Sequence, residues 1–74
     1  MPILASKKER LLAIGELILQ RRQALKLTRM ALAVKLGCAL STIQTWEKGK
    51  GLPGDLHRAA LAEYLAIDPK ELTA

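Results

Sequence analysis

The chain has almost no cysteine, histidine or aromatic residues, and these absences exclude several classes of protein. Its single cysteine, Cys38, cannot form a disulfide within the chain, so nothing in the sequence points to secretion. One cysteine and one histidine, His57, are too few for a structural zinc site, and we expect no metal or cofactor. With Trp46 and Tyr64 as the only aromatic residues, a platform that stacks the bases of a single strand is not expected.

Long apolar runs and pairs of catalytic groups are also absent. The most apolar stretch, residues 11–19, is too short to span a membrane and contains Glu16, so no membrane association is expected. No small-residue cleavage site follows this stretch, which argues against a signal peptide and favours a cytoplasmic protein. No nucleophile is paired with a general base, and we expect no enzymatic activity.

The residues that are present predict one small globular domain with an aliphatic core. Hydrophobic residues make up 50% of the 74 residues and charged residues 26%, a composition typical of folded chains. Folding of a chain of this size buries about 60% of the unfolded surface, which is enough for one core. We expect a single domain over residues 1–74, in which residues 1–10 could form an N-terminal arm.

Turn signals divide the chain into short helices and leave no strand pattern. Ser6, followed by Glu9 three residues later, is a capping-box arrangement that begins the first helix. This helix should end near Lys26. Thr28 is a good N-cap for the second helix, and Gly37 should end it because glycine tolerates the left-handed conformation.

Three further helices complete the prediction of five. The third runs over residues 40–48, and the fourth begins near Asp55 and turns Leu56 inward with Ala60, Leu61 and Leu65. Residues 68–72 supply a cap and a proline at the first helical position, so a short fifth helix is expected. In the first helix, Gly15 marks a place where another element packs closely.

Positive charge is concentrated in the middle of the chain. Residues 17–54 carry seven basic side chains and one acidic side chain, a net charge of +6, whereas residues 55–74 have a net charge of −2. A strongly basic segment favours a polyanionic partner, and we expect the surface that faces phosphates to lie on the second and third helices.

Residues 29–48 have the layout of a helix-turn-helix, in which two helices meet across a tight turn. Such a unit needs apolar inner faces, a small residue where the helices cross, and a turn residue that accepts positive φ. Ala33 meets the second condition and Gly37 the third. The seven residues that satisfy the conditions together are Leu32, Ala33, Leu36, Gly37, Cys38, Ile43 and Trp46.

Several short motifs at fixed spacing carry a family resemblance. They are Leu27-Thr28, Leu32-Ala33, Leu36-Gly37, Ser41-Thr42-Ile43 and Trp46-Glu47-Lys48-Gly49-Lys50. Over residues 11–73 the chain resembles the Cro/cI-type (Xre-like) helix-turn-helix family of phage and bacterial regulators. The resemblance implies an all-α, compact, five-helix, lambda-repressor-like domain that binds double-stranded DNA sequence-specifically and regulates transcription.

In the fold that the resemblance implies, the third helix enters the major groove with its N-terminal half leading. The residues expected to read bases are Leu40, Ser41, Gln44 and Thr45. Gln44 can bond N6 and N7 of adenine together, and no arginine lies on this face, which favours an A·T-containing half-site. The residues expected to hold backbone phosphates are Arg29, Thr42, Lys48 and Lys50.

The chain departs from the family pattern at four positions, and at the first of them Ala31 replaces a frequent glutamate and gives up a capping box. The family often has glutamine where Arg29 stands, and Arg29 is expected to keep the phosphate-binding role. Ala39 cannot cap the third helix. Lys26 replaces the usual glycine and requires either a strained left-handed residue or a different turn.

Family members also often pair an arginine late in the first helix with the glutamate of the Trp-Glu segment. Arg22 and Glu47 have that spacing here. Two interpretations stay open: a partly buried ion pair that fixes the third helix against the first, or two separate surface charges.

A single recognition helix buries little surface, so we expect a homodimer on a palindrome with half-sites about 34 Å apart. The resemblance implies a dimer contact around the last two helices, formed by Tyr64, Ile67 and Leu72. The apolar residues near the N-terminus exceed what one core needs, and either a self-association surface or burial of the arm would explain them. These residues are Ile3, Leu4, Leu11, Leu12 and Leu19.

Repression by occlusion is expected, because Glu47 is the only acid in residues 29–48 and the second helix lacks the acidic patch of some family activators. The alternative function is an antitoxin that binds a toxin partner and uses DNA binding to control its own operon. Cys38 is expected to pack in the turn, and His57 to be solvated on the fourth helix.

Overall fold

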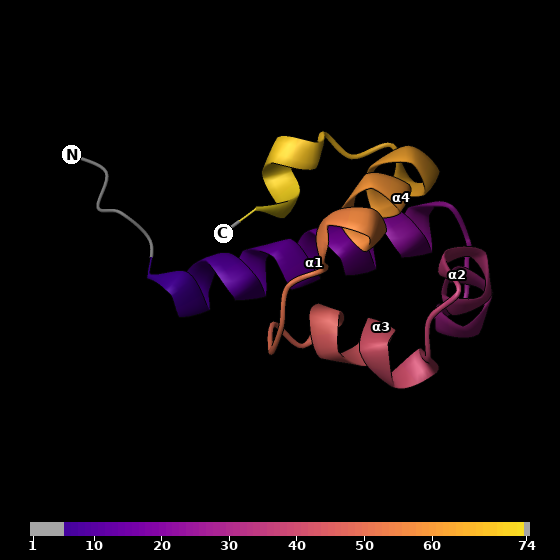
Figure 1. Cartoon of the computed structure of the whole chain (residues 1–74), viewed down its shortest axis with the longest axis horizontal. Helices are drawn as coiled ribbons and strands as arrows, with labels where there is room; N and C mark the ends of the chain where they lie inside the picture. Colours follow the sequence, from indigo (N-terminus) through magenta and orange to yellow (C-terminus); the bar gives the residue numbers. More distant parts are fainter. Residues whose placement is uncertain (1–5, 74) are drawn as a thin grey trace.

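Residues 6–73, which a computed structural model describes, form four α-helices and one short 3-10 helix, with no strand among them (Figure 1). The elements are α1 (Lys7–Ala24), α2 (Arg29–Leu36), α3 (Leu40–Glu47), α4 (Asp55–Leu65) and the 3-10 helix η1 (Pro69–Leu72). Residues 1–5 lie outside the described residues, and with them half of the expected arm, including Ile3 and Leu4; residues 7–10 belong to α1.

The prediction of five α-helices is wrong in its last element. Asp68 caps residues 69–72 as expected, accepting a hydrogen bond from the backbone N–H of Lys70 at 3.0 Å, and Pro69 stands at the start. However, the segment has four residues and Thr73 is extended, so i→i+4 bonds cannot propagate. The bond from the N–H of Glu71 to the carbonyl of Asp68 instead spans three residues. The described part of the chain is therefore all-helical, with four α-helices.

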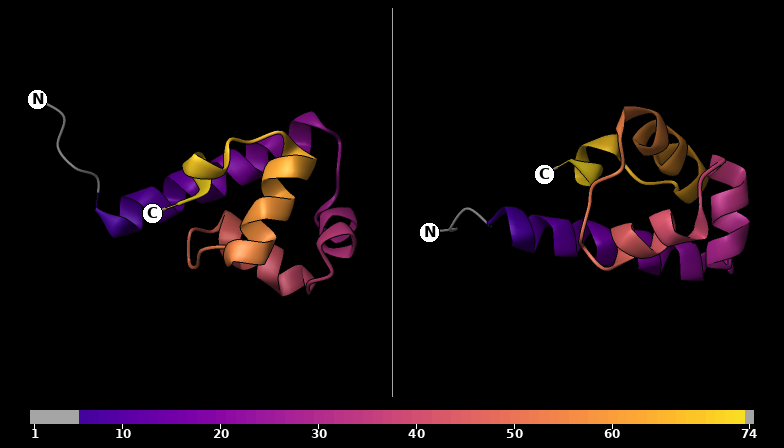
Figure 2. Two further views of the ribbon diagram at one scale, coloured as in Figure 1. Left: turned by 45° about the horizontal axis from the view of Figure 1, so that its top comes forward. Right: turned by 60° about the horizontal axis from the view of Figure 1, so that its bottom comes forward.

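The longest helix, α1, carries the rest of the domain along its middle and C-terminal part, while its first turns project beyond the other elements (Figures 1 and 2). The predicted capping box is present: the Ser6 hydroxyl accepts from the N–H of Glu9 at 3.1 Å, and the Glu9 carboxylate accepts from the N–H of Ser6 at 3.2 Å. Arg21 donates from Nε to the carbonyl of Leu65 at 2.9 Å, which ties the C-terminal end of α4 to α1.

Left-handed residues lie in the turns on both sides of α2. Lys26 follows α1 with a φ of 58°, the left-handed alternative foreseen for a non-glycine residue at this position. Gly37 ends α2 with a φ of 68°, and Thr28 caps its start by accepting from the N–H of Ala31 at 3.0 Å. Ala39 precedes α3 without any side-chain cap, also as expected.

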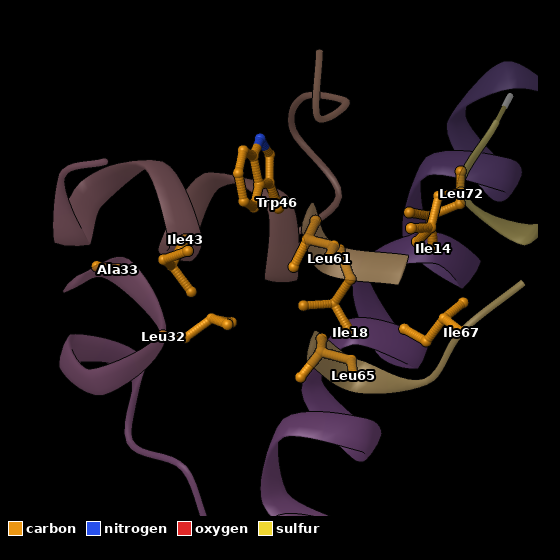
Figure 3. Close-up of a cluster of buried hydrophobic side chains, with 10 residues drawn as sticks. All are labelled: Ile14, Ile18, Leu32, Ala33, Ile43, Trp46, Leu61, Leu65, Ile67 and Leu72. Carbon is orange, nitrogen blue, oxygen red and sulfur yellow. The ribbon is translucent and has the colours of Figure 1, made fainter. Parts of the chain in front are cut away.

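The core joins side chains from every element (Figure 3). Its fully buried members are Ile18, Leu32, Ile43, Leu61, Leu65 and Leu72. The expectation that Leu56 points into this core is wrong, because 87% of the residue is exposed. Leu61 and Leu65 set the inward face of α4, and Leu56 lies about 140° around the helix from Leu61 at 100° per residue.

Candidate nucleic-acid interface

The helix-turn-helix is built from α2 and α3, which meet across the turn at Gly37. Ile43 and Trp46 are buried, with 0% and 4% of each residue exposed, and they orient α3 with its opposite side toward solvent. Leu32 and Ala33 are also buried, and Leu36 and Cys38 are partly buried against the same core. The structure therefore brings the expected structural residues of the unit together.

The residues expected to read bases differ in how freely they are presented. Ser41 and Thr45 are exposed, whereas Leu40 and Gln44 are half-buried. The Thr45 hydroxyl donates to the carbonyl of Ser41 at 2.9 Å, and its methyl group lies next to Gly51 of the following loop. In this set, the side chains of Ser41 and Gln44 therefore have the polar groups that are more available to bond a base.

A shallow hollow at the junction of three helices contains two of these residues. It is lined by Arg22, Gln23, Thr28, Arg29, Met30, Leu40 and Gln44. The hollow brings an expected phosphate ligand, Arg29, to the same place as an expected base reader, Gln44. Gln23 and Met30 were not singled out from the sequence, because neither residue belongs to the short motifs that carry the family resemblance.

The other expected phosphate ligands lie on or directly after α3. Thr42 is half-buried in its first turn, and Lys48 and Lys50 are exposed after its last turn. Among the described side chains, neither lysine forms a salt bridge. The charge of this end of the unit is therefore free to act on a polyanion.

Arg22 and Glu47 form a buried ion pair between α1 and α3. Nε of Arg22 donates to Oε2 of Glu47 at 2.6 Å, and Nη2 donates to Oε1 at 3.3 Å. Nη1 of Arg22 donates to the carbonyl of Leu27 at 2.8 Å, so all three guanidinium nitrogens have partners. With 9% and 3% of the two side chains exposed, these residues are not separate surface charges.

Glu47 has a second cationic partner that sequence analysis missed. Nε of Arg29 donates to Oε1 of Glu47 at 2.8 Å, while 46% of the Arg29 side chain remains exposed. The two residues are 18 positions apart on different helices, and no local pattern indicates that the arginine side chain crosses to α3. Only the close packing of α1, α2 and α3 brings the three charged groups together.

The expected dimer residues need a correction. Ile67 and Leu72 are 5% and 0% exposed because they fill the space between η1, α1 and α4, so they have almost no surface left for a second copy. Tyr64 is 43% exposed, and Nζ of Lys35 lies 5.5 Å from the centroid of its ring. Of the three, Tyr64 alone presents an exposed surface.

The single cysteine and the single histidine both pack against the protein. Cys38 is half-buried next to the core, and burial raises the pKa of its thiol above the ordinary value, which disfavours the reactive thiolate. The ring of His57 packs on Trp46 with centroids 5.3 Å apart and planes at 59°. His57 is therefore a packing residue beside α3 rather than a fully solvated side chain.

Comparisons with known proteins agree with this geometry. A family model described as a helix-turn-helix domain matches residues 13–74. The fold is similar to the crystal structure of the restriction-modification controller protein C.AhdI from Aeromonas hydrophila, with a TM-score of 0.74 and 28% identity. This similarity covers 85% of the present chain and 96% of that chain. No curated protein sequence matches the chain. Within residues 6–73, no helix has the length and apolar character needed to cross a membrane.

Proposed function

Because the chain belongs to the helix-turn-helix domain family, we propose that it is a transcription regulator that binds double-stranded DNA sequence-specifically and reads the major groove with α3. The orientation of α3 is the observation that carries this proposal. Ile43 and Trp46 are buried, so Ser41 and the exposed edge of Gln44 face outward within a segment whose net charge is +6. The similarity to a controller protein supports a regulator.

Base recognition would rest on the first turns of α3. Gln44 can donate to N7 and accept from N6 of one adenine, and Leu40 can pack on a thymine methyl group. Ser41 can bond several bases, and Thr45 would contribute through the surface that its bond to Ser41 leaves free. The absence of arginine on this face supports an operator with A·T pairs in each half-site.

Contacts to phosphates would set the register of α3 in the groove. Arg29 reaches across from α2, Thr42 lies in the first turn of α3, and Lys48 and Lys50 follow its last turn. Such contacts carry little sequence information, but they supply most of the affinity at low salt.

We further propose a homodimer on a palindromic operator. An eight-residue recognition helix offers little surface for specificity, and two copies double it. Tyr64 and Leu56 are exposed apolar residues on α4, and a second copy is the occupant that would cover them in a symmetric contact. Ile67 and Leu72 no longer belong to this surface.

We propose repression rather than activation. Glu47 is the only acid in residues 29–48, and only 3% of its side chain is exposed. The outer face of α2 and α3 therefore presents no carboxylate to a polymerase, and occupation of the operator would act by blocking access. Co-purification of a second small protein from the host would support the antitoxin alternative instead.

Selection of bound duplexes from a random pool, followed by a salt titration on the selected duplex, tests the proposal. Gln44→Ala should reduce discrimination at one base position of each half-site by about 1–3 kcal/mol and leave binding to random DNA almost unchanged. Gln20→Ala on the exposed face of α1 is the matched control. Equal losses on selected and random DNA would remove Gln44 from the base readers, and no preference among duplexes in dilute buffer would overturn the function.

A further inference from the structure

The junction of α1, α2 and α3 has one carboxylate and two guanidinium groups. Glu47 accepts from Arg22 on both oxygens and from Arg29 on Oε1, and it is the only acid in residues 17–54. One negative charge therefore faces two positive charges, and the positive charge in excess is that of Arg29, the more exposed of the two arginines. Because the Arg29 side chain is 46% exposed and that of Arg22 is 9% exposed, an incoming anion can reach Arg29.

The two arginines differ in how many of their donors are used. Arg22 donates from Nε, Nη1 and Nη2 to Glu47 and to the carbonyl of Leu27. Arg29 donates only from Nε, and among the described residues no acceptor is found for its Nη1 and Nη2. Arg29 also lines the hollow that contains Thr28 and Gln44. Its unused donors thus belong to a group anchored on α3 and placed beside an expected base reader.

From this arrangement, and on the basis of the function proposed above, we infer that Glu47 is a positioning residue for DNA binding. It holds Arg29 through Nε, so that Nη1 and Nη2 form a fork for one backbone phosphate next to the base read by Gln44. One guanidinium group can donate to the carboxylate and to the phosphate at the same time, because its donors lie in one rigid plane. A lysine ammonium is a single point charge on a flexible stem, and it cannot keep the same planar contact with both carboxylate and phosphate.

Glu47, which holds Arg29, lies on α3 itself, and its position there affects the register of α3 in the groove. Glu47 and Gln44 are one turn apart on α3, so the spacing between the fixed phosphate contact and the base contact is set within a single rigid element. An arginine held only by α2 would lack this link to α3.

Arg29→Lys tests the inference because it keeps the charge and removes the fork. On the selected duplex the variant should bind about tenfold more weakly than wild type, with the same slope of log K against log salt. Arg10→Lys is the matched control, since it makes the same exchange at an exposed arginine in the first turn of α1 to which no DNA contact is assigned, and it should bind within about twofold of wild type. Wild-type affinity in Arg29→Lys would overturn the inference and leave the proposed function intact, whereas wild-type protein without preference among duplexes would overturn the function itself.

A second measurement locates the phosphate. A neutral methylphosphonate placed at each backbone position in turn should weaken wild type about tenfold at one position per half-site, and weaken Arg29→Lys much less at that position. Equal losses for both proteins at every position would contradict the assignment of Arg29.

The free protein provides a readout that does not depend on DNA. By NMR, the Nε proton of Arg29 should exchange with water much more slowly than that of Arg10, an exposed arginine whose side chain forms no hydrogen bond with any other residue in the range 6–73. In Glu47→Gln, checked first for folding by thermal unfolding, this protection should fall. If that variant does not fold, the wild-type comparison decides: exchange as fast as that of Arg10 would show that Glu47 does not hold Arg29.

Discussion

Replacement of Gly15 by alanine should force α1 away from the C-terminal end of α3. A Cβ at this position would contact the carbonyl oxygen of Trp46 and lie 2.8 Å from the carbonyl oxygen of Glu47, both backbone atoms at the end of α3. Backbone atoms cannot move aside as a side chain does, so the helices themselves must shift. Overpacking at such a contact costs up to about 3 kcal/mol. Alanine favours the helix over glycine by about 1 kcal/mol, so the free energy of unfolding should fall by about 2 kcal/mol.

Thermal and urea unfolding, followed by circular dichroism, measure this loss. For a domain of this size, 2 kcal/mol corresponds to a Tm lowered by about 8–16 °C. Gly54→Ser is the control, because a Cβ at Gly54 meets no atom within 4 Å and serine is a better N-cap for α4. Unchanged or increased stability in Gly15→Ala would show that helix propensity decides at this position, and would refute the argument that the α1–α3 contact requires glycine.

Two further substitutions test the turn after α1 and the surface of α4. Lys26→Gly should stabilise the protein by about 1 kcal/mol, since it relieves a non-glycine residue with a φ of 58°; an unchanged urea midpoint would mean that the turn carries no strain. Leu56→Asp should shift sedimentation equilibrium toward the monomer while each copy stays folded by circular dichroism, because 87% of Leu56 is exposed in one copy. A stable dimer in this variant would exclude the α4 surface around Leu56 as the contact.

The local signals in the sequence predicted the helix boundaries well where a cap defines them. Ser6 with Glu9, Thr28 and Gly37 act through bonds to backbone atoms within a few residues, so their effect can be inferred without the rest of the fold. The last element was predicted incorrectly as an α-helix. The cap at Asp68 is real, but a cap begins a turn and does not determine whether the turn continues as an α-helix.

Predictions about which side chains are exposed were less reliable. Leu56 and Leu72 are both leucines in short amphipathic segments, yet the first is 87% exposed and the second is fully buried. Hydrophobicity favours burial of either, but the angle at which α4 and η1 lie on α1 decides which one has a partner. The spacing of apolar residues within one helix does not predict the angle at which that helix packs on another.

The sequence by itself determined that this chain forms a helix-turn-helix with a basic surface, because caps, a left-handed glycine and apolar spacing act locally and charge is a property of composition. Only the tertiary structure decided that Glu47 is shared by Arg22 and Arg29, and that Ile67 is buried while Tyr64 stays exposed. These outcomes depend on distances between elements far apart along the chain, and such distances are set when the helices pack together in three dimensions.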